Sequence, residues 1–150
     1  MANRYNNRRI IRGGQKIAPG KLLPGMILTF NYSEKNVKDP RPILLFLRND
    51  KGLIEGVNIN YLNPTKLKKL FSVIEFKKGK LDEEENLVFL KEDYFRIQIS
   101  NPKKRSAMSP KRFYSDVILS DKYFKQAYRS YKIGSLTSLQ VSQINTEFIV

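Results

Sequence analysis

The sequence contains no histidine, no cysteine and no tryptophan. Without histidine and cysteine, the chain cannot form a Ser-His-Asp or Cys-His nucleophile, a zinc site with the usual nitrogen and sulfur ligands, or a disulfide. No phosphate-binding glycine loop of the Walker A or dinucleotide type is present. Chemistry based on carboxylates alone stays open. These absences favour a binding or structural protein without metal or cofactor over an enzyme.

Targeting segments are also missing. No apolar run approaches the roughly 18 residues that a membrane-spanning helix needs, and the Arg- and Asn-rich start lacks the apolar stretch of a secretory signal. We therefore expect no membrane partner. The chain has 150 residues, of which 41% are hydrophobic, and it includes 8 Tyr and 9 Phe. This length and composition predict one domain with one modest core.

Acidic residues are scarce in two parts of the chain. Overall, 28 Lys and Arg stand against 14 Asp and Glu, which gives a formal net charge of +14. Residues 1–21 hold six basic groups and no acid, whereas residues 22–102 hold 13 basic and 11 acidic groups. Residues 103–132 hold nine basic groups and two acids. The positive charge is therefore concentrated in a first segment and in a later one.

Residues 1–21 predict an extended basic arm. Few large apolar side chains occur there, and Gly13-Gly14 and Pro19-Gly20 interrupt it, so the segment cannot bury enough surface to order itself. Four of its six charges are arginines, whose guanidinium groups suit bidentate contacts with carboxylate or phosphate. We expect the arm to contact a neighbouring subunit or nucleic acid, and a solvated tail is the alternative. The candidate contact residues are Arg4, Arg8, Arg9, Arg12 and Lys16.

Residues 22–150 predict a single α+β domain. Alternating and continuous apolar patterns predict strands over 26–32, 43–47 and 53–60, with a hairpin turn at Asn49-Asp50-Lys51-Gly52. Gly56 is expected to mark a bulge or a close backbone approach. We interpret this part, about 22–62, as a small SH3-like β-barrel.

Short helices are expected after the barrel. Thr65 is expected to cap the first of them, over residues 66–71. The helical part over about 103–134 contains two more, which Ser109 and Asp121 are expected to cap. The apolar side of the last helix would include Tyr128 and Tyr131. The pattern over 81–100 fits either short strands or a helix followed by a strand, and residues 135–150 fit a docking tail or a last strand.

Two sets of residues carry a resemblance to known families. Pro24-Gly25-Met26-Ile27 and Arg41-Pro42-Ile43-Leu44-Leu45-Phe46-Leu47 resemble the opening strands of SH3-like barrels in the PemK/MazF toxin group. A longer series resembles small tailed-bacteriophage proteins of unassigned role: Pro24-Gly25, Phe30-Asn31-Tyr32, Pro42-Ile43-Leu44 and Gly56-Val57-Asn58-Ile59-Asn60-Tyr61-Leu62. This resemblance covers about residues 22–132 and implies a phage setting rather than an activity. A toxin-type ribonuclease would need acid–base and phosphate-stabilising groups, for which Arg41 is the sole candidate.

The second basic segment alternates aromatic and basic residues between Lys111 and Lys132. Such a pattern occurs in surfaces that bind single-stranded nucleic acid. It also fits amphipathic helices that bury Phe113, Phe124 and Tyr128 and expose the charges, which we favour. The candidate partner- or nucleic-acid-binding residues of this segment are Lys103, Lys104, Arg105, Lys111 and Arg112.

Two polar groups have weaker functional interpretations. The run Asp82-Glu83-Glu84-Glu85 offers oxygen ligands for a divalent cation, but adjacent carboxylates do not converge, so a solvated turn is favoured. Asn58, Asn60 and Tyr61 could line a site, although hydrogen bonding at a strand end is the simpler interpretation.

The combined expectation is a non-enzymatic structural component of a large assembly. We expect a tailed-phage virion (capsid, neck, tail or baseplate), assembled in the host cytoplasm. Its partners would be other protein subunits, with contacts to DNA or RNA through phosphates. The alternative is a nucleic-acid-binding module of phage replication or transcription.

Overall fold

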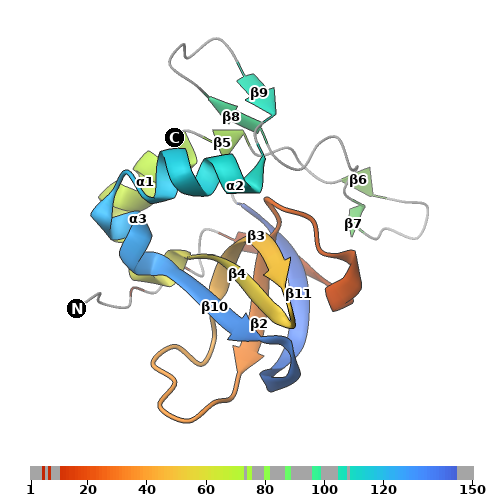
Figure 1. Ribbon diagram of the computed structural model, residues 1–150. Coiled ribbons are helices and arrows are strands. Elements are labelled where there is room, and N and C mark those ends of the chain that lie inside the picture. Colours follow the sequence, from red (N-terminus) through yellow and green to blue (C-terminus); the bar gives the residue numbers. More distant parts are fainter. Residues whose placement is uncertain are drawn as a thin grey trace.

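A six-stranded antiparallel sheet forms the centre of the computed structural model, which describes residues 5, 7, 11–72, 74–75, 80–81, 87–88, 96–98, 105–107 and 109–144. The strands follow one another in the order β1-β11-β2-β3-β4-β10 (Figure 1). Their bounds are β1 (Ile11–Lys16), β2 (Ile27–Tyr32), β3 (Ile43–Asp50), β4 (Leu53–Asn58), β10 (Tyr128–Lys132) and β11 (Leu136–Ile144).

The three predicted strands are confirmed as β2, β3 and β4. The turn between β3 and β4 consists of Lys51 and Gly52, whose φ angles are 48° and 82°. Positive φ at both central residues is the geometry of a two-residue type I′ turn, which matches the twist of a hairpin. The predicted hairpin between residues 43 and 60 is therefore also confirmed.

The α+β class is confirmed, but the sheet is not closed into a barrel. β1 and β10 are its two end strands, and no pairing joins them in the described part of the chain. Three of the six strands lie outside residues 22–62, where the barrel was predicted. β11 comes from the C-terminal region and inserts between β1 and β2, which decides residues 136–144 in favour of a strand. Such long-range pairing leaves no local signal in the sequence.

Part of the predicted arm belongs to this sheet. β1 pairs antiparallel with β11, from Ile11 opposite Ile144 to Lys16 opposite Gln140. Residues 11–16 bury too little apolar surface to order themselves, and pairing with the backbone of β11 orders them as a strand. Asn7 is also held against the domain, because its Nδ2 donates to the carbonyl oxygen of Ile59 at 2.7 Å. Arg4, Arg8 and Arg9 lie outside the described residues.

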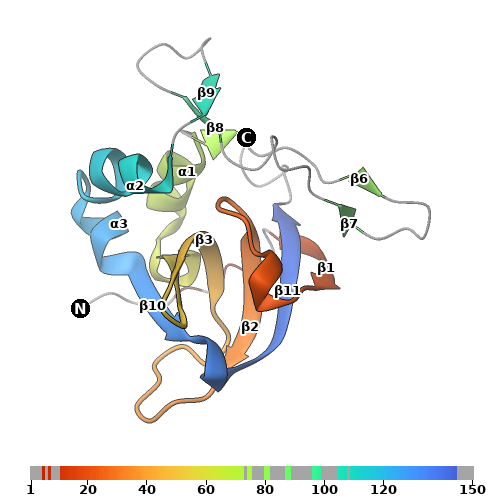
Figure 2. The same cartoon turned by 45° about the vertical axis from the view of Figure 1, so that its right-hand side comes forward.

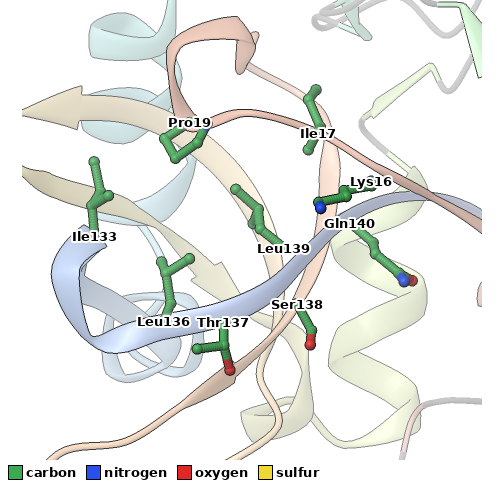
Figure 3. A pocket seen from close by; sticks show the side chains of 9 residues that line it. All are labelled: Lys16, Ile17, Pro19, Ile133, Leu136, Thr137, Ser138, Leu139 and Gln140. Atoms are coloured by element: carbon green, nitrogen blue, oxygen red, sulfur yellow. The ribbon is translucent and has the colours of Figure 1, made fainter.

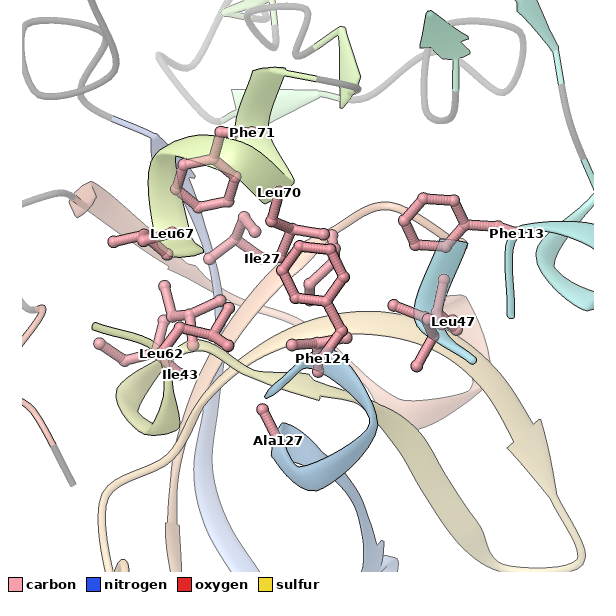
Figure 4. Packing of buried hydrophobic residues seen from close by; sticks show 14 residues of the cluster. Ile27, Ile43, Leu47, Leu62, Leu67, Leu70, Phe71, Phe113, Phe124 and Ala127 are labelled. Atoms are coloured by element: carbon pink, nitrogen blue, oxygen red, sulfur yellow. The ribbon is translucent and has the colours of Figure 1, made fainter. Parts of the chain in front are cut away.

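Apolar side chains cover both faces of the central strands. On one face, Met26, Leu28 and Phe30 join residues from β3, β4, β10 and β11 in a single buried cluster. The cluster joins side chains from five neighbouring strands on this face. On the other face, Ile43, Leu45 and Leu47 pack against the helices (Figure 4). The continuous apolar run of β3 is thus explained by burial on both sides.

The helices lie over this second face. They are α1 (Pro64–Ser72), α2 (Pro110–Phe113) and α3 (Lys122–Ala127), together with the π-helical turn η5 (Tyr114–Ile118). The 3₁₀ turns are η2 (Pro19–Lys21), η3 (Ile59–Tyr61) and η6 (Ile133–Ser135), and Ile133 of η6 packs against the cluster on the first face. Two of the three predicted caps are confirmed. Thr65 does not cap α1, because the helix begins at Pro64 and the Asn63 Oδ1 accepts the hydrogen bond from the Lys66 N–H at 2.9 Å. The Ser109 Oγ accepts a hydrogen bond from the Arg112 N–H at 3.2 Å, and the Asp121 Oδ1 accepts one from the Tyr123 N–H at 2.8 Å.

The predicted helical part differs from the structure at both ends. Arg105 lies in strand β9 (Arg105–Ala107), before the first helix of this region. The last helix ends at Ala127, and the next five residues form β10, where Tyr131 pairs with Ile54 of β4. The prediction of a helix over residues 128–132 was wrong. The aromatic residues there fit both the helical and the strand periodicity, and pairing with the edge of β4 makes the segment a strand.

Five short strands lie outside the six-stranded sheet in the described part of the chain (Figure 2). β5 (Ile74–Glu75), β8 (Arg96–Gln98) and β9 form one small sheet, and β6 (Lys80–Leu81) pairs with β7 (Leu87–Val88). Where residues 81–100 are described, they are strands, which settles the two alternatives there. The acidic run Asp82–Glu85 lies outside the described residues, and so do Lys103 and Lys104.

Candidate functional site

The described members of the predicted basic set do not form one surface. Arg12 and Arg105 lie in β1 and β9. Lys16 borders one hollow of the molecule, and Lys111 borders another. Arg112 is exposed on α2 and pairs with Asp116 at 3.2 Å. The described residues of this set therefore lie on three elements, β1, β9 and α2.

The hollow at Lys16 is largely apolar. It has a volume of about 460 Å³ and lies between η2, η6 and β11. Figure 3 shows Ile17, Pro19, Ile133 and Leu136 around it, with Thr137 and Ser138 on the nearby part of β11. Among the described residues that line it, Lys16 is the only charged one.

The hollow at Lys111 lies between α2 and strands β3, β4 and β10. It has a volume of about 650 Å³, and Arg48, Glu55, Tyr114 and Tyr128 are among the residues that line it. The carboxylate of Glu55 accepts hydrogen bonds from Arg48, from Tyr128 at 3.2 Å and from Ser130 at 3.2 Å. Burial alone would raise the pKa of Glu55, but the Arg48 guanidinium keeps it below its usual value. Glu55 thus ties three strands together.

The polar residues at the end of β4 form a buried network. Asp39, from the β2–β3 connection, accepts hydrogen bonds from the side-chain amides of Asn58 at 2.9 Å and Asn60 at 3.0 Å. Asn58 also donates to the Tyr131 hydroxyl at 2.9 Å. The network fastens the long β2–β3 connection to β4 and β10. The interpretation of Asn58 and Asn60 as strand-end hydrogen-bonding residues is confirmed.

A basic surface that the sequence did not select lies on α1 and α3. Its centre consists of Lys66 and Lys69 on α1, Lys122 and Tyr123 on α3, and Asp121 between the helices; we call it the α1–α3 lysine surface. The two helices lie side by side in both views (Figures 1 and 2). Lys68 and Lys125 are exposed on the same two helices.

Asp121 holds the centre of this surface together. Its side chain is buried, and its Oδ2 accepts hydrogen bonds from the ammonium groups of Lys66 at 2.9 Å and Lys69 at 3.0 Å. Burial alone would raise the pKa of Asp121, but these two lysines and the Tyr123 N–H together hold it well below its usual range. Asp121 is therefore a carboxylate throughout the neutral range, and one negative charge is shared between two lysines.

Aromatic rings alternate between the core and the surface at this point. Phe124 is buried among the helices and β3 (Figure 4), whereas Tyr123 is 41% exposed. The Lys66 Nζ lies 4.7 Å and the Lys122 Nζ 5.1 Å from the centroid of the Tyr123 ring, within the range of a cation–π contact. Phe113 and Phe124 are buried on helices, as the amphipathic interpretation predicted, whereas Tyr128 is half-buried and lies on strand β10. Tyr123 keeps the aromatic and basic pattern at the surface.

The sequence contained only half of the signal for this surface. Lys122 and Tyr123 belong to the segment of alternating aromatic and basic residues, whereas Lys66 and Lys69 lie in the first predicted helix and were not selected. Asp121, identified as a helix cap, is the link, because its second oxygen reaches across to α1. On α1, the short basic run Lys66-Leu67-Lys68-Lys69 was the local sequence feature that could have indicated a basic surface.

The fold and this surface together define a small antiparallel sheet domain with few helices and an exposed basic and aromatic face. Comparisons with family models, curated proteins and solved structures found no match. Across the described residues, no helix is long and apolar enough to cross a membrane. The same residues contain no group of three acidic side chains placed to hold a metal ion.

Proposed function

We propose that this protein is a non-enzymatic component of a large assembly and binds the phosphates of a nucleic acid through the α1–α3 lysine surface. The supporting observation is the arrangement of lysines around Tyr123 and Asp121. Three ammonium groups converge there on one carboxylate and one exposed ring. Two more exposed lysines lie on the same helices, so the surface has a strong excess of positive charge.

The net charge of the whole chain strengthens this proposal. Lysines that neutralise phosphates release condensed counterions, which drives binding at low and moderate salt. A formal net charge of +14 also attracts polyanions at long range. The predicted arm contributes to this attraction through its arginines, Arg4, Arg8, Arg9 and Arg12.

The assembly that we propose is a tailed-phage virion, in which the protein also docks on neighbouring subunits. The support is the resemblance of residues 22–132 to small tailed-phage proteins. We further propose that β2, β3 and β4 correspond to the opening strands of an SH3-like barrel, which their consecutive antiparallel pairing and shared buried cluster support. The same lysine surface would serve a module of phage replication or transcription. Recovery of the protein in purified virions favours the first setting, and its restriction to the infected-cell lysate favours the second.

A salt series tests the binding proposal. The purified full chain is titrated with oligonucleotides between low and physiological salt. We expect log K to fall linearly with log salt, with a slope of about −0.7 to −0.9 for each phosphate contact, and measurable affinity at physiological salt. No binding at low salt would contradict the proposal, and so would weak binding that vanishes well below physiological salt.

Asp121→Asn is expected to tighten binding several-fold. Asparagine still caps α3, but the substitution removes the negative charge that now holds Lys66 and Lys69. Both ammonium groups then become available to phosphate. The dissociation constant at fixed salt is the measurement.

The matched control for that variant is Asp116→Asn. Asp116 lies on η5 and pairs with Arg112, so this change raises the net charge by the same amount at another place. An equal gain from both variants would mean that net charge alone governs binding, and it would count against the α1–α3 lysine surface.

A further inference from the structure

Tyr123 is an exposed ring on a rigid support. Together with Leu119, it is one of two large hydrophobic side chains that the described residues expose. Its backbone N–H is bound by the Asp121 carboxylate, and the next residue, Phe124, is anchored in the core. The chain therefore fixes the base of the Tyr123 side chain while its ring stays open to solvent.

The two lysines near this ring are held differently. The Lys66 ammonium is fixed by its 2.9 Å hydrogen bond to Asp121. Lys122 is exposed and has no ion pair or hydrogen bond through its ammonium group among the described residues. A flexible exposed lysine loses little when it leaves a cation–π contact. A flat ligand can therefore displace Lys122 from the Tyr123 ring. The Lys122 ammonium group can then bind a nearby anion.

A nucleotide provides both a flat ligand for the Tyr123 ring and an anion for the Lys122 ammonium group. Its base has a flat π face, and its phosphate lies within reach of neighbouring ammonium groups. An aromatic ring among lysines is the arrangement that binds single strands with little regard to sequence, because every base has such a face. In a duplex, the bases are stacked on one another and their faces are hidden. A lysine surface alone would bind duplex as well as single strand, so the ring is the feature that discriminates.

We infer that Tyr123 stacks on an unpaired base, so that the α1–α3 lysine surface binds single-stranded nucleic acid in preference to duplex. This inference rests on the proposed function and adds the class of ligand. Lys66 and Lys69 remain with Asp121 as the fixed part of the surface. Lys122 moves from the ring to a phosphate when the base arrives.

The absence of tryptophan from the chain allows a direct test. Tyr123→Trp gives the full-length protein a single tryptophan at the proposed stacking position. Its fluorescence is recorded during titration with a single-stranded oligothymidylate of about 12 nucleotides and with a duplex of the same length. We expect strong quenching by the single strand and little change with the duplex. Binding of the single strand without any change in fluorescence would overturn the inference.

Two further variants separate stacking from charge. Tyr123→Ala is expected to weaken binding of the single strand about tenfold, as for the loss of one stacked base, and to leave duplex affinity nearly unchanged. Tyr123→Phe keeps the ring and should restore the affinity. Leu119→Ala removes the other exposed hydrophobic side chain and should have no effect.

The outcomes also distinguish this inference from the proposed function. If Tyr123→Ala binds both ligands as the unsubstituted chain does, the inference fails and the phosphate-binding function stands. If the unsubstituted chain binds neither ligand, both fail. Circular dichroism of each variant verifies that it is folded. The tryptophan variant retains a large ring at the surface and provides the test even if alanine disturbs α3.

Discussion

Gly56→Ala is expected to lower the free energy of unfolding by about 3 kcal/mol or to prevent folding altogether. Gly56 lies in β4, where it is opposite Phe46 of β3 on one side and Arg129 of β10 on the other. A Cβ atom at this position would lie 2.0 Å from the carbonyl oxygen of Leu45 and 2.8 Å from its carbonyl carbon. Both atoms belong to backbone in the middle of the sheet, so neither can move without breaking the pairing of β3 and β4.

Urea denaturation of the variant and of Gly134→Ala measures this effect. Gly134 lies in η6, where an added Cβ would have no atom within 4 Å. The control is therefore expected to change stability by about 0.5 kcal/mol at most. Equal stability of both variants would show that β3 and β4 do not approach each other as described.

Gly56 also shows what the sequence revealed about the sheet. The pattern predicted a bulge or a close approach there. The structure shows the close approach at Gly56 and an irregular register in the facing strand β3. The register between β3 and β4 shifts between Phe46 and Arg48, and the Leu45 carbonyl approaches the glycine closely. A glycine inside a strand weakens it, so its presence among apolar strand residues often marks a bulge or a close backbone approach.

The partners of the edge strands could not be predicted in the same way. Residues 11–16 have no apolar pattern of their own, and they form a strand because β11 offers them a free edge. Tyr128 to Lys132 fitted a helical side, but the edge of β4 makes them a strand. In both cases a contact between distant segments outweighed local preference, as β-propensity allows.

The candidate surface was predictable only in its parts. The sequence identified Asp121 as a cap and the aromatic and basic alternation around Tyr123. It gave no sign that α1 packs beside α3, since Lys66 and Lys122 are separated by more than fifty residues. The docking of these helices depends on the buried residues Leu70 and Phe124 in the shared core, and their partners cannot be assigned from periodicity.

Lys122→Glu combined with Lys125→Glu is expected to weaken nucleic-acid binding by about 10- to 100-fold at fixed salt. Both lysines are exposed on α3, and neither makes an ion pair in the described part of the chain. The fold and the Asp121 contacts should therefore persist. Each substitution replaces an attraction to phosphate with a repulsion, and together they lower the net charge by four.

The matched control is Lys21→Glu combined with Lys35→Glu. Lys21 lies in η2, and Lys35 lies in the connection between β2 and β3; both are exposed. This variant has the same net charge as the first, so the long-range attraction of a polyanion is reduced equally in both. Any difference between the two variants reports contacts made at the α1–α3 lysine surface.

The most direct measurement is the dissociation constant of a single-stranded oligothymidylate, determined at physiological salt for the unsubstituted chain and for these two variants. The account predicts a large loss for Lys122→Glu with Lys125→Glu and a small loss for Lys21→Glu with Lys35→Glu. Equal losses in the two variants, or full affinity in the first, would contradict the assignment of nucleic-acid binding to α1 and α3.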